Sequence, residues 1–318
     1  MRLLFIIDPH ASLVAKKDST IALMRAAARR GDCVYSAEMG DLSIADGKVL
    51  VLAEQLEIFA EDSKEGAWMR VLEQGLHPSD FFDAVLMRKE PPVDEDFLMC
   101  TRLLAIVNQH TPVVNHPQAL QAQNEKLSIL DFPDLIAPTW VGASVTAADA
   151  FRQQHNKVVL KPLNAMGGQG IYISEATDLN FRSIFDLLSA NGKQLIMAQA
   201  YLPAARAGDF RVFALNGRGL PWMLARIPRD DDHRGNMAAG GNAEARPLDS
   251  AAQKIVDVVA PVIAKRGIGL AGLDVIGGRL IEINITCPTG LREVQEQTGE
   301  DIATTVLTEI TQSAQATD

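Results

Sequence analysis

The segment from Gly272 to Asn284 constrains this chain more than any other, because its two apolar runs around a glycine turn predict a β-hairpin. Three oxygen-bearing side chains, Asp274, Glu282 and Asn284, lie on strands whose other residues are mostly apolar, as is typical of buried strands. Apolar strands seldom carry a carboxylate unless something pairs with it. The hairpin therefore predicts either a binding site or a polar edge of a sheet.

The register of this hairpin decides whether the three side chains meet. Side chains of a strand alternate between faces, so Glu282 and Asn284 share one face. A two-residue turn pairs Asp274 with Ile281 and separates the carboxylates, whereas a three-residue turn over 277–279 sets Asp274 opposite Glu282. We expect the three-residue turn. It gathers an all-oxygen cluster of the kind that Mg²⁺ prefers when it also holds substrate phosphates.

The composition is that of an ordinary soluble globular protein, with 318 residues of which 47% are hydrophobic and 22% charged. The formal net charge is −10 and no basic block occurs, which argues against nucleic acid as a partner. Cys33, Cys100 and Cys287 are too few and too far apart for a disulfide framework or a zinc site, so we expect a reducing cytoplasm. We expect no membrane association, because no apolar run is long enough to cross a bilayer.

Hydrophobic patterning divides the chain into three predicted lobes. Residues 1–122 alternate strands and helices, which predicts a largely parallel sheet with helices on its faces. Residues 123–202 predict a smaller α+β lobe, and residues 203–318 a third lobe that includes a polar loop at 228–246. The predicted strands cover 2–7, 83–87, 111–114, 138–142, 157–161, 171–174, 194–200, 209–215 and 222–227. The predicted helices cover 19–30, 94–110, a segment from 146, 180–190, 250–266 and a segment from 300.

A glycine-rich loop at 164–170 follows an apolar strand that carries Lys161. Glycines let a backbone wrap closely round a phosphate and aim its N–H groups inward. The loop is neither a Walker A element nor a dinucleotide fingerprint, because no Gly-Lys-Ser/Thr follows and a strand comes next. A plain hairpin turn is the alternative, but Lys161 favours a phosphate site. Lys126 is a second candidate phosphate ligand or, taken alone, a solvated helix residue.

Arginines in the C-terminal third form a candidate anion site, since the planar guanidinium binds carboxylate or phosphate at two points. Arg211 faces the same side of a predicted strand as Asp209, and Arg226 lies on another apolar strand. Arg234 belongs to the polar segment 229–242, whose composition suits a mobile lid or a plain exposed loop. Scattered surface charge is the alternative for any one arginine. The candidate set is Arg211, Arg226, Arg234 and Arg292.

Taken in order, these features resemble the ATP-grasp superfamily of carboxylate–amine ligases, and most closely the bacterial glutathione synthetases. The order is a lysine, a strand lysine, a glycine loop, a strand before Tyr-Leu-Pro, an Asp-x-Arg strand and an Asp…Glu-x-Asn hairpin. The likeness covers essentially the whole chain. The resembling segments are 16–19, 39–42, 87–92, 124–126, 197–203, 224–228, 234–241 and 282–286.

The resemblance implies an α/β protein with an ATP-grasp fold, in which an N-terminal parallel α/β lobe precedes two α+β lobes with ATP between them. It implies an enzyme that ligates γ-glutamylcysteine and glycine through an acyl phosphate, using ATP and Mg²⁺ or Mn²⁺. It also implies a cytoplasmic homo-oligomer, a tetramer in this family. The alternatives are another ATP-grasp ligase and a non-catalytic ATP-binding protein. Intact metal and arginine positions speak against the non-catalytic protein.

The resemblance also assigns roles to single residues. Stabilisation of the transferring phosphoryl group falls to Arg211, Arg226 and Arg234. ATP contacts fall to Lys126, Lys161, Gly167, Gly168, Gly170, Gln199, Tyr201, Leu202, Asp209 and Asn236. The metal ligands are Asp274, Glu282 and Asn284, and the dipeptide contacts are Asp8, Ser12, Arg88 and Arg292. The chain departs from the family at Glu90, Ala165 and Cys287, where aspartate, glycine and serine are common; Ala165 can alter the motion of the glycine loop.

Overall fold

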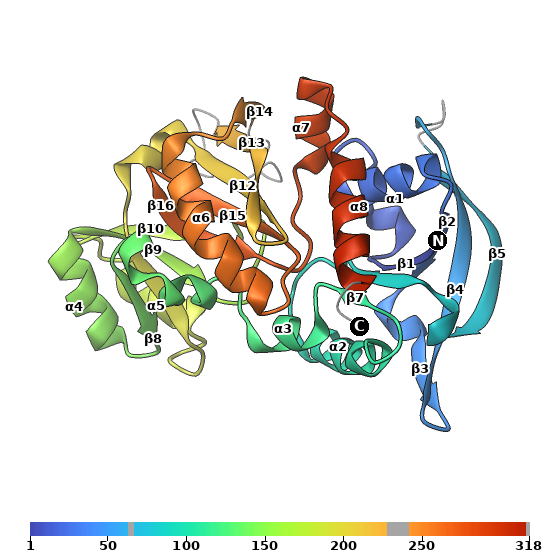
Figure 1. The fold of residues 1–318 in the computed structure, drawn as a ribbon. Helices are drawn as coiled ribbons and strands as arrows, with labels where there is room; N and C mark the ends of the chain where they lie inside the picture. The colour runs from blue at the N-terminus through green and yellow to red at the C-terminus, as the bar shows by residue number, and fades with distance from the viewer. Residues whose placement is uncertain (63–66, 228–241, 316–318) are drawn as a thin grey trace.

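The computed structural model describes residues 1–62, 67–227 and 242–315, which form three sheets with flanking helices (Figure 1). None of the described helices is both long enough and apolar enough to cross a membrane. Short 3₁₀ turns occur at His10–Ser12, Met39–Asp41, Ser79–Phe81, Leu127–Asp131, Pro133–Leu135 and Pro203–Ala207.

The N-terminal sheet has the strand order β3-β4-β2-β1-β6-β7, and β5 pairs with β4. Its parallel part contains the three predicted strands, β1 (Arg2–Ile6), β6 (Ala84–Met87) and β7 (Val113–Val114), and also β2 (Cys33–Ala37), which the sequence analysis did not predict. The sequence analysis did not identify the antiparallel strands β3 (Leu42–Ala45), β4 (Lys48–Ile58) and β5 (Met69–Pro78). The connection of β3 to β4 by only two residues explains their direction, because parallel strands need a long crossover.

Two of the helices on the N-terminal sheet begin at side-chain caps. The carboxylate of Asp18 accepts hydrogen bonds from the backbone N–H groups of Thr20 and Ile21, and Asp94 caps the next helix in the same way. The helices are α1 (Ser19–Arg29), α2 (Glu95–Val107) and α3 (Pro117–Ala122). The last helix, α8 (Ile302–Gln315), returns to pack beside α1 and shares its apolar core (Figure 1).

The central sheet is antiparallel, with the order β10-β9-β11-β8. Its strands are β8 (Thr139–Gly142), β9 (Lys157–Pro162), β10 (Tyr172–Glu175) and β11 (Ile196–Ala200), which match the predicted ones within two residues. Helices α4 (Val145–His155) and α5 (Phe181–Leu188) cover one face and enclose a small core around Phe185. The opposite face is left for the cavity described below.

The third sheet has the order β14-β13-β12-β15-β16, and α6 (Ser250–Lys265) packs across it (Figure 1). Four of its strands are β12 (Asp209–Leu215), β13 (Arg218–Ile227), β15 (Leu270–Ile276) and β16 (Arg279–Asn284), and the fifth is β14. Two elements differ from the sequence prediction: β14 (Asn242–Pro247) is a strand where a loop was expected, and α7 (Leu291–Thr298) was not expected at all. Most of the predicted loop, 228–241, lies outside the described residues.

The β15–β16 hairpin confirms the predicted pairing but not the predicted turn. Asp274 lies opposite Glu282, as expected. Ile276 pairs with Arg279, however, so the turn is the two-residue Gly277-Gly278 and the three-residue prediction is wrong. A bulge just after Asp274 takes up the extra residue of β16 and restores the register. Both turn glycines have positive φ, 54° and 71°, which a two-residue hairpin turn of this kind requires.

Candidate active site

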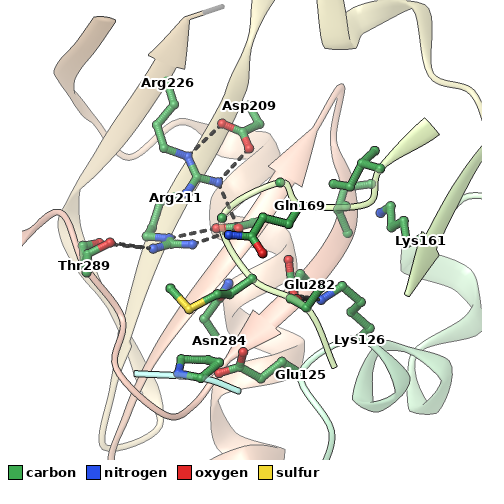
Figure 2. A pocket seen from close by; sticks show the side chains of 18 of the residues that line it. Glu125, Lys126, Lys161, Gln169, Asp209, Arg211, Arg226, Glu282, Asn284 and Thr289 are labelled. Carbon is green, nitrogen blue, oxygen red and sulfur yellow. Dashed lines mark hydrogen bonds and ion pairs between the residues drawn. The ribbon is translucent and has the colours of Figure 1, made fainter. Parts of the chain in front are cut away.

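A cavity of about 440 Å³ lies where the central sheet faces the third sheet, and the N-terminal lobe contributes one wall. Its lining combines the glycine loop, strands of both sheets, and Ser12, Asp18 and Glu90 from the first lobe. Figure 2 shows the polar end, where lysine, arginine, carboxylate and carboxamide side chains converge. Segments from all three lobes therefore meet at one site.

The cavity wall on the third sheet carries an interlocked cluster of ion pairs (Figure 2). Arg211 Nε and Nη2 donate to the two carboxylate oxygens of Asp274, each at 2.9 Å. Arg226 donates to both oxygens of Asp209, at 2.8 and 2.6 Å, and its Nη2 also lies 2.9 Å from Asp274. Strand register produces this cluster, because Asp209 lies opposite Arg226 and Arg211 lies opposite Asp274.

The same cluster fixes the charge of its central carboxylate. Burial alone would raise the pKa of Asp274, but Arg211 and Arg226 outweigh burial and hold that pKa well below its ordinary value. Arg211 Nη1 is occupied as well, because it donates to the hydroxyl and carbonyl oxygens of Thr289. Two guanidinium groups are thus held rigidly at the cavity, as stabilisation of an anionic transition state requires.

The predicted metal ligands lie on neighbouring strands but have different hydrogen-bond partners. Glu282 and Asn284 of β16 line the cavity, and Asn284 Nδ2 donates to Gly272 O at 3.2 Å, so among the described residues its amide oxygen is an available acceptor. Asp274 instead gives both oxygens to arginines. Among the described residues no three His, Cys, Asp or Glu side chains cluster as a metal centre. The mixed carboxylate and carboxamide set still fits Mg²⁺, which prefers oxygen ligands.

Both candidate phosphate lysines are buried at this cavity. Lys126 Nζ lies 2.9 Å from Glu282 Oε1 and donates to Ala165 O at 2.6 Å, so it is not the solvated residue of the alternative interpretation. Lys161 Nζ donates to Gln199 Oε1 at 2.5 Å. Burial lowers the pKa of Lys161 to about 8. An ammonium group in such a position is poised to bind an anion.

The glycine loop borders the same end of the cavity. Gly167, Gly168 and Gly170 have φ values of 65°, 77° and 67°, in the left-handed region that side chains disfavour. All but Gly170 are lining residues, as are the neighbouring Ala165, Met166 and Gln169. Ala165, where the family commonly has glycine, presents its carbonyl oxygen to Lys126. The loop thus connects to the lysine that the resemblance assigns to phosphate.

Apolar side chains line another part of the cavity, and they suit the faces of an aromatic base. This lining includes Val159, Ile171, Ile173, Tyr201, Leu202 and Ile281. Lys157 Nζ lies 4.7 Å from the centre of the Tyr201 ring, a cation–π contact that helps to hold the ring in place. Tyr201 and Leu202, which the resemblance assigns to ATP, therefore belong to this apolar part of the lining.

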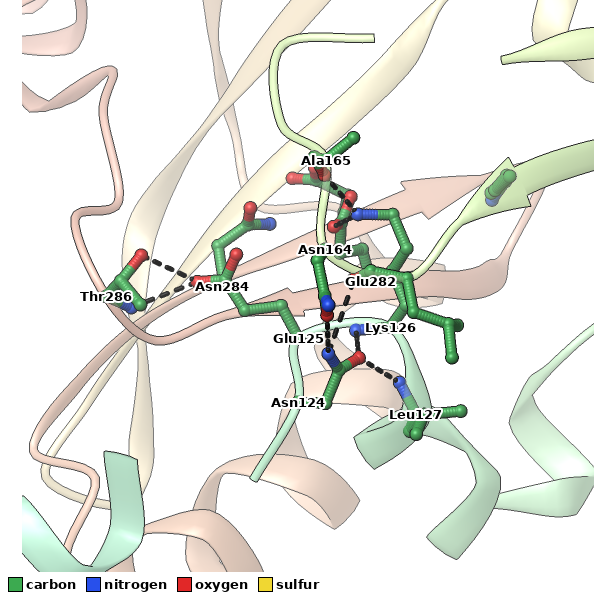
Figure 3. Close-up of polar contacts among 12 residues, drawn as sticks. Asn124, Glu125, Lys126, Leu127, Asn164, Ala165, Glu282, Asn284 and Thr286 are labelled. Atoms are coloured by element: carbon green, nitrogen blue, oxygen red, sulfur yellow. Dashed lines mark hydrogen bonds and ion pairs between the residues drawn. The ribbon is translucent and has the colours of Figure 1, made fainter. Parts of the chain in front are cut away.

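Glu125 is a residue of the site to which the sequence analysis gave no role. Glu125 Oε1 accepts hydrogen bonds from Ile285 N, Thr286 N and Thr286 Oγ1 at 2.8, 3.0 and 2.9 Å (Figure 3). Its backbone carbonyl also accepts from Ile283 N at 2.9 Å. Burial and the nearby Glu282 raise the pKa of Glu125. Its position directly before Lys126 was the one available sequence signal.

The predicted dipeptide contacts are only partly at the cavity. Ser12 lines it, whereas Asp8, Arg88 and Arg292 are not among its lining residues. Asp8 pairs with Lys89 at 2.8 Å, and Arg292 pairs with Glu296 at 2.6 Å. Arg88 is buried and donates to Thr20 Oγ1 and Pro288 O.

Two further predicted residues, Arg234 and Asn236, lie outside the described part of the chain. Cys287 does line the cavity, and burial raises its pKa to about 12, which describes an inert thiol at neutral pH.

Family models match nearly the whole chain. Residues 1–121 match the prokaryotic glutathione synthetase N-terminal domain, and residues 125–299 match the prokaryotic glutathione synthetase ATP-grasp domain. The glutathione synthetase of Neisseria meningitidis serogroup B is 40% identical over 305 residues, covering 95% of this chain and 96% of the relative. That of Ralstonia nicotianae is 41% identical over 304 residues, covering 95% and 93%.

Solved structures show the same fold at low sequence identity. D-cycloserine synthetase DcsG has a TM-score of 0.70 at 15% identity, covering 98% of this chain and 99% of its own. A RiPP-associated ATP-grasp ligase of Chryseobacterium gregarium, solved with ADP and a leader and core peptide, has a TM-score of 0.65 at 13% identity, with 96% of each chain covered. The ATP-grasp fold predicted from the sequence is confirmed.

Proposed function

This chain belongs to the prokaryotic glutathione synthetase family, and we propose that it ligates γ-glutamylcysteine to glycine with ATP, giving glutathione, ADP and phosphate. One observation carries the proposal from the geometry. A single cavity joins an apolar end, two buried lysines and two buried arginines held by carboxylates. That arrangement suits transfer of a phosphoryl group from a nucleotide to a carboxylate.

The residues at the cavity match the two steps of an acyl-phosphate ligation. The cysteinyl carboxylate of the dipeptide attacks the γ-phosphorus of ATP, and ADP leaves. The amine of glycine then attacks the acyl carbon, loses a proton and expels phosphate. Lys126, Lys161, Arg211 and Arg226 neutralise the phosphoryl oxygens in the first step, and the arginines hold the leaving phosphate in the second. No side-chain nucleophile is needed.

A divalent cation completes the proposed site. Asp274, Glu282 and Asn284 would hold Mg²⁺, or Mn²⁺, which would add positive charge beside the phosphates. The oxygen donors of Glu282 and Asn284 at the cavity support this assignment. An ionised carboxylate offers about four acceptor positions, and the two arginines take three of those of Asp274, so one position is left through which Asp274 would join them.

The remaining assignments rest on the resemblance and are part of the same proposal. The lobes divide at 122/123 and 202/203, and the enzyme is a cytoplasmic homotetramer with small-molecule substrates. Asp8, Ser12, Arg88 and Arg292 hold the dipeptide, directly or through the residues that they contact. The segment 229–242, with Arg234 and Asn236, closes over the reacting groups and excludes water from the acyl phosphate.

The deciding experiment measures ADP release from ATP and Mg²⁺ with γ-glutamylcysteine, in the presence and absence of glycine, with mass detection of the product. We expect ADP release that depends on glycine and a product with the mass of glutathione. Release only with other acids or amines would transfer the proposal to another ATP-grasp ligase. Absence of ADP with every pair, despite ATP binding, would refute catalysis.

Arg211 supplies a matched test of the site within this experiment. Arg211→Ala should lower kcat by about a thousandfold while it changes nucleotide affinity by less than about tenfold, because the guanidinium acts on the developing phosphoryl charge. Arg218→Ala is the control, since Arg218 is an exposed arginine of the neighbouring strand that pairs with Glu309. Equal activity of both variants would contradict the role of Arg211.

A further inference from the structure

Three polar side chains form a row across the central sheet, on the face toward the cavity. Thr139 of β8 lies opposite Gln199 of β11, and Lys161 of β9 lies opposite Met197, two positions before Gln199 on β11. Opposite residues of antiparallel strands project to the same face, and side chains two positions apart do so as well. The fold therefore brings the three side chains into a line that ends at the phosphate end of the cavity.

Each hydrogen bond in this row has a single possible direction. The Thr139 hydroxyl donates its one proton to Ala137 O at 2.8 Å, so toward Gln199 it can only accept. Gln199 Nε2 accordingly donates to Thr139 Oγ1 at 3.1 Å, which turns Gln199 Oε1 toward Lys161 Nζ. An ammonium group can only donate, so the two ends of the row agree on the orientation of the amide.

The amide of Gln199 alone holds the ammonium group of Lys161 within the described ranges. Within the described ranges, Gln199 is its one hydrogen-bond partner, and no carboxylate lies within ion-pairing distance of its Nζ. A neutral amide oxygen orients the ammonium group without neutralising it. The charge of Lys161 is thereby kept available for an incoming phosphate, whereas Lys126 is already paired with Glu282.

We propose that Thr139 is a positioning residue for nucleotide binding, although it does not line the cavity. By accepting from Gln199 Nε2 it fixes the amide so that the amide oxygen holds Lys161 Nζ at the phosphate end. This inference rests on the proposed function in one respect, namely that Lys161 binds a phosphate of ATP. Nothing in the family resemblance or in the cavity lining assigns a role to Thr139.

Thr139→Val tests this role at nearly constant volume. The variant leaves Gln199 Nε2 without its acceptor, and the freed amide can turn its N–H groups toward the ammonium group. The loss of one buried hydrogen bond should weaken MgATP binding about tenfold, and the KM for ATP should rise by the same factor. The kcat at saturating ATP should change less than the KM, because Lys161 is displaced rather than removed and Lys126, Arg211 and Arg226 keep their places.

Two further variants separate positioning from packing. Thr139→Ser keeps the hydroxyl and should restore affinity to within about threefold of wild type. Thr101→Val makes the same substitution in α2 of the first lobe, where the buried Thr101 hydroxyl donates to Leu98 O at 2.8 Å. This control should share any general loss of thermal stability while its ATP affinity stays unchanged.

The measurement is titration calorimetry of the full chain with Mg²⁺ and a non-hydrolysable ATP analogue, together with steady-state kinetics. Wild-type affinity in Thr139→Val, equal impairment of the Val and Ser variants, or a fall in kcat at unchanged KM would each overturn the role of Thr139. Failure of the wild type to make glutathione would refute the proposed function alone, because analogue binding still decides on Thr139. A wild type that binds no nucleotide would refute both.

Discussion

Lys161 should take up a proton when nucleotide binds at mildly alkaline pH. Burial lowers the pKa of its ammonium group to about 8 in the ligand-free protein, Lys126 lowers it further, and Glu282, Asp274 and Asp209 partly offset these effects. A triphosphate placed against Lys161 raises that pKa again, because an adjacent anion favours the charged form. Binding of nucleotide and protonation of this lysine are therefore linked.

The size of the effect follows from this pKa. A group with a pKa of about 8 is neutral in about 10% of molecules at pH 7, about half at pH 8 and about 90% at pH 9. Nucleotide binding should therefore take up about 0.1, 0.5 and 0.9 protons at these pH values. The sign is fixed: affinity is full below pH 8 and falls as pH rises through 8, approaching tenfold per unit above it.

Titration calorimetry in buffers of different ionisation enthalpy measures this uptake directly, with Mg²⁺ and a non-hydrolysable ATP analogue. Lys161→Arg is the matched control, because a guanidinium stays charged over the whole range and should show no uptake from this position. Wild-type uptake that does not change between pH 7 and pH 9, or uptake that persists in Lys161→Arg, would refute the reasoning.

Two further predictions concern stability and thiol chemistry. Asp274→Asn leaves two buried guanidinium groups short of a counter-ion and should lower the free energy of unfolding by about 3–5 kcal/mol, measured by urea denaturation. The pKa of Asp274 is depressed in the folded protein, so its carboxylate contributes fully to the stability above the ordinary carboxyl pKa of about 4. This contribution is lost only as the pH falls below that range. The difference in stability between wild type and variant should therefore be constant between about pH 5 and pH 8. Among the cysteines, exposed Cys33 should react first with a thiol reagent at pH 8, because Cys100 is buried and Cys287 is half-buried. Burial raises the pKa of both to about 12, so each carries about a thousandfold less thiolate at pH 8 than an ordinary thiol. Mass spectrometry follows the modification of each cysteine, and equal rates would contradict this prediction.

Local patterns predicted the parts of the site that depend on one strand or one hairpin. Alternation along β16 placed Glu282 and Asn284 on one face, and the pairing of Asp274 with Glu282 was right although the turn was shorter than expected. The bulge that reconciles the two was not predictable, because a bulge adds one residue without a sequence mark of its own.

The sequence could not reveal contacts that depend on the order of strands in a sheet. β15 lies between β12 and β16, so Asp274 has neighbours on both sides and meets Arg211 as well as Glu282. The hairpin pattern in the sequence predicted only the contact with Glu282. Glu125 was missed for a similar reason, since its partners Ile285 and Thr286 lie about 160 positions away in the chain.

The structure finally suggests why nucleotide and metal should strengthen each other's binding. Lys126 is paired with Glu282 at 2.9 Å, so a phosphate that takes Lys126 leaves Glu282 with an unpaired charge at the cavity. A divalent cation held by Glu282 and Asn284 removes that cost, and the phosphate in turn removes the repulsion between the cation and Lys126. ATP affinity should accordingly rise more than tenfold when Mg²⁺ is added, and Glu282→Gln should lose most of that gain. If Mg²⁺ improves ATP binding equally in Glu282→Gln, Glu282 is not the group that couples the two ligands.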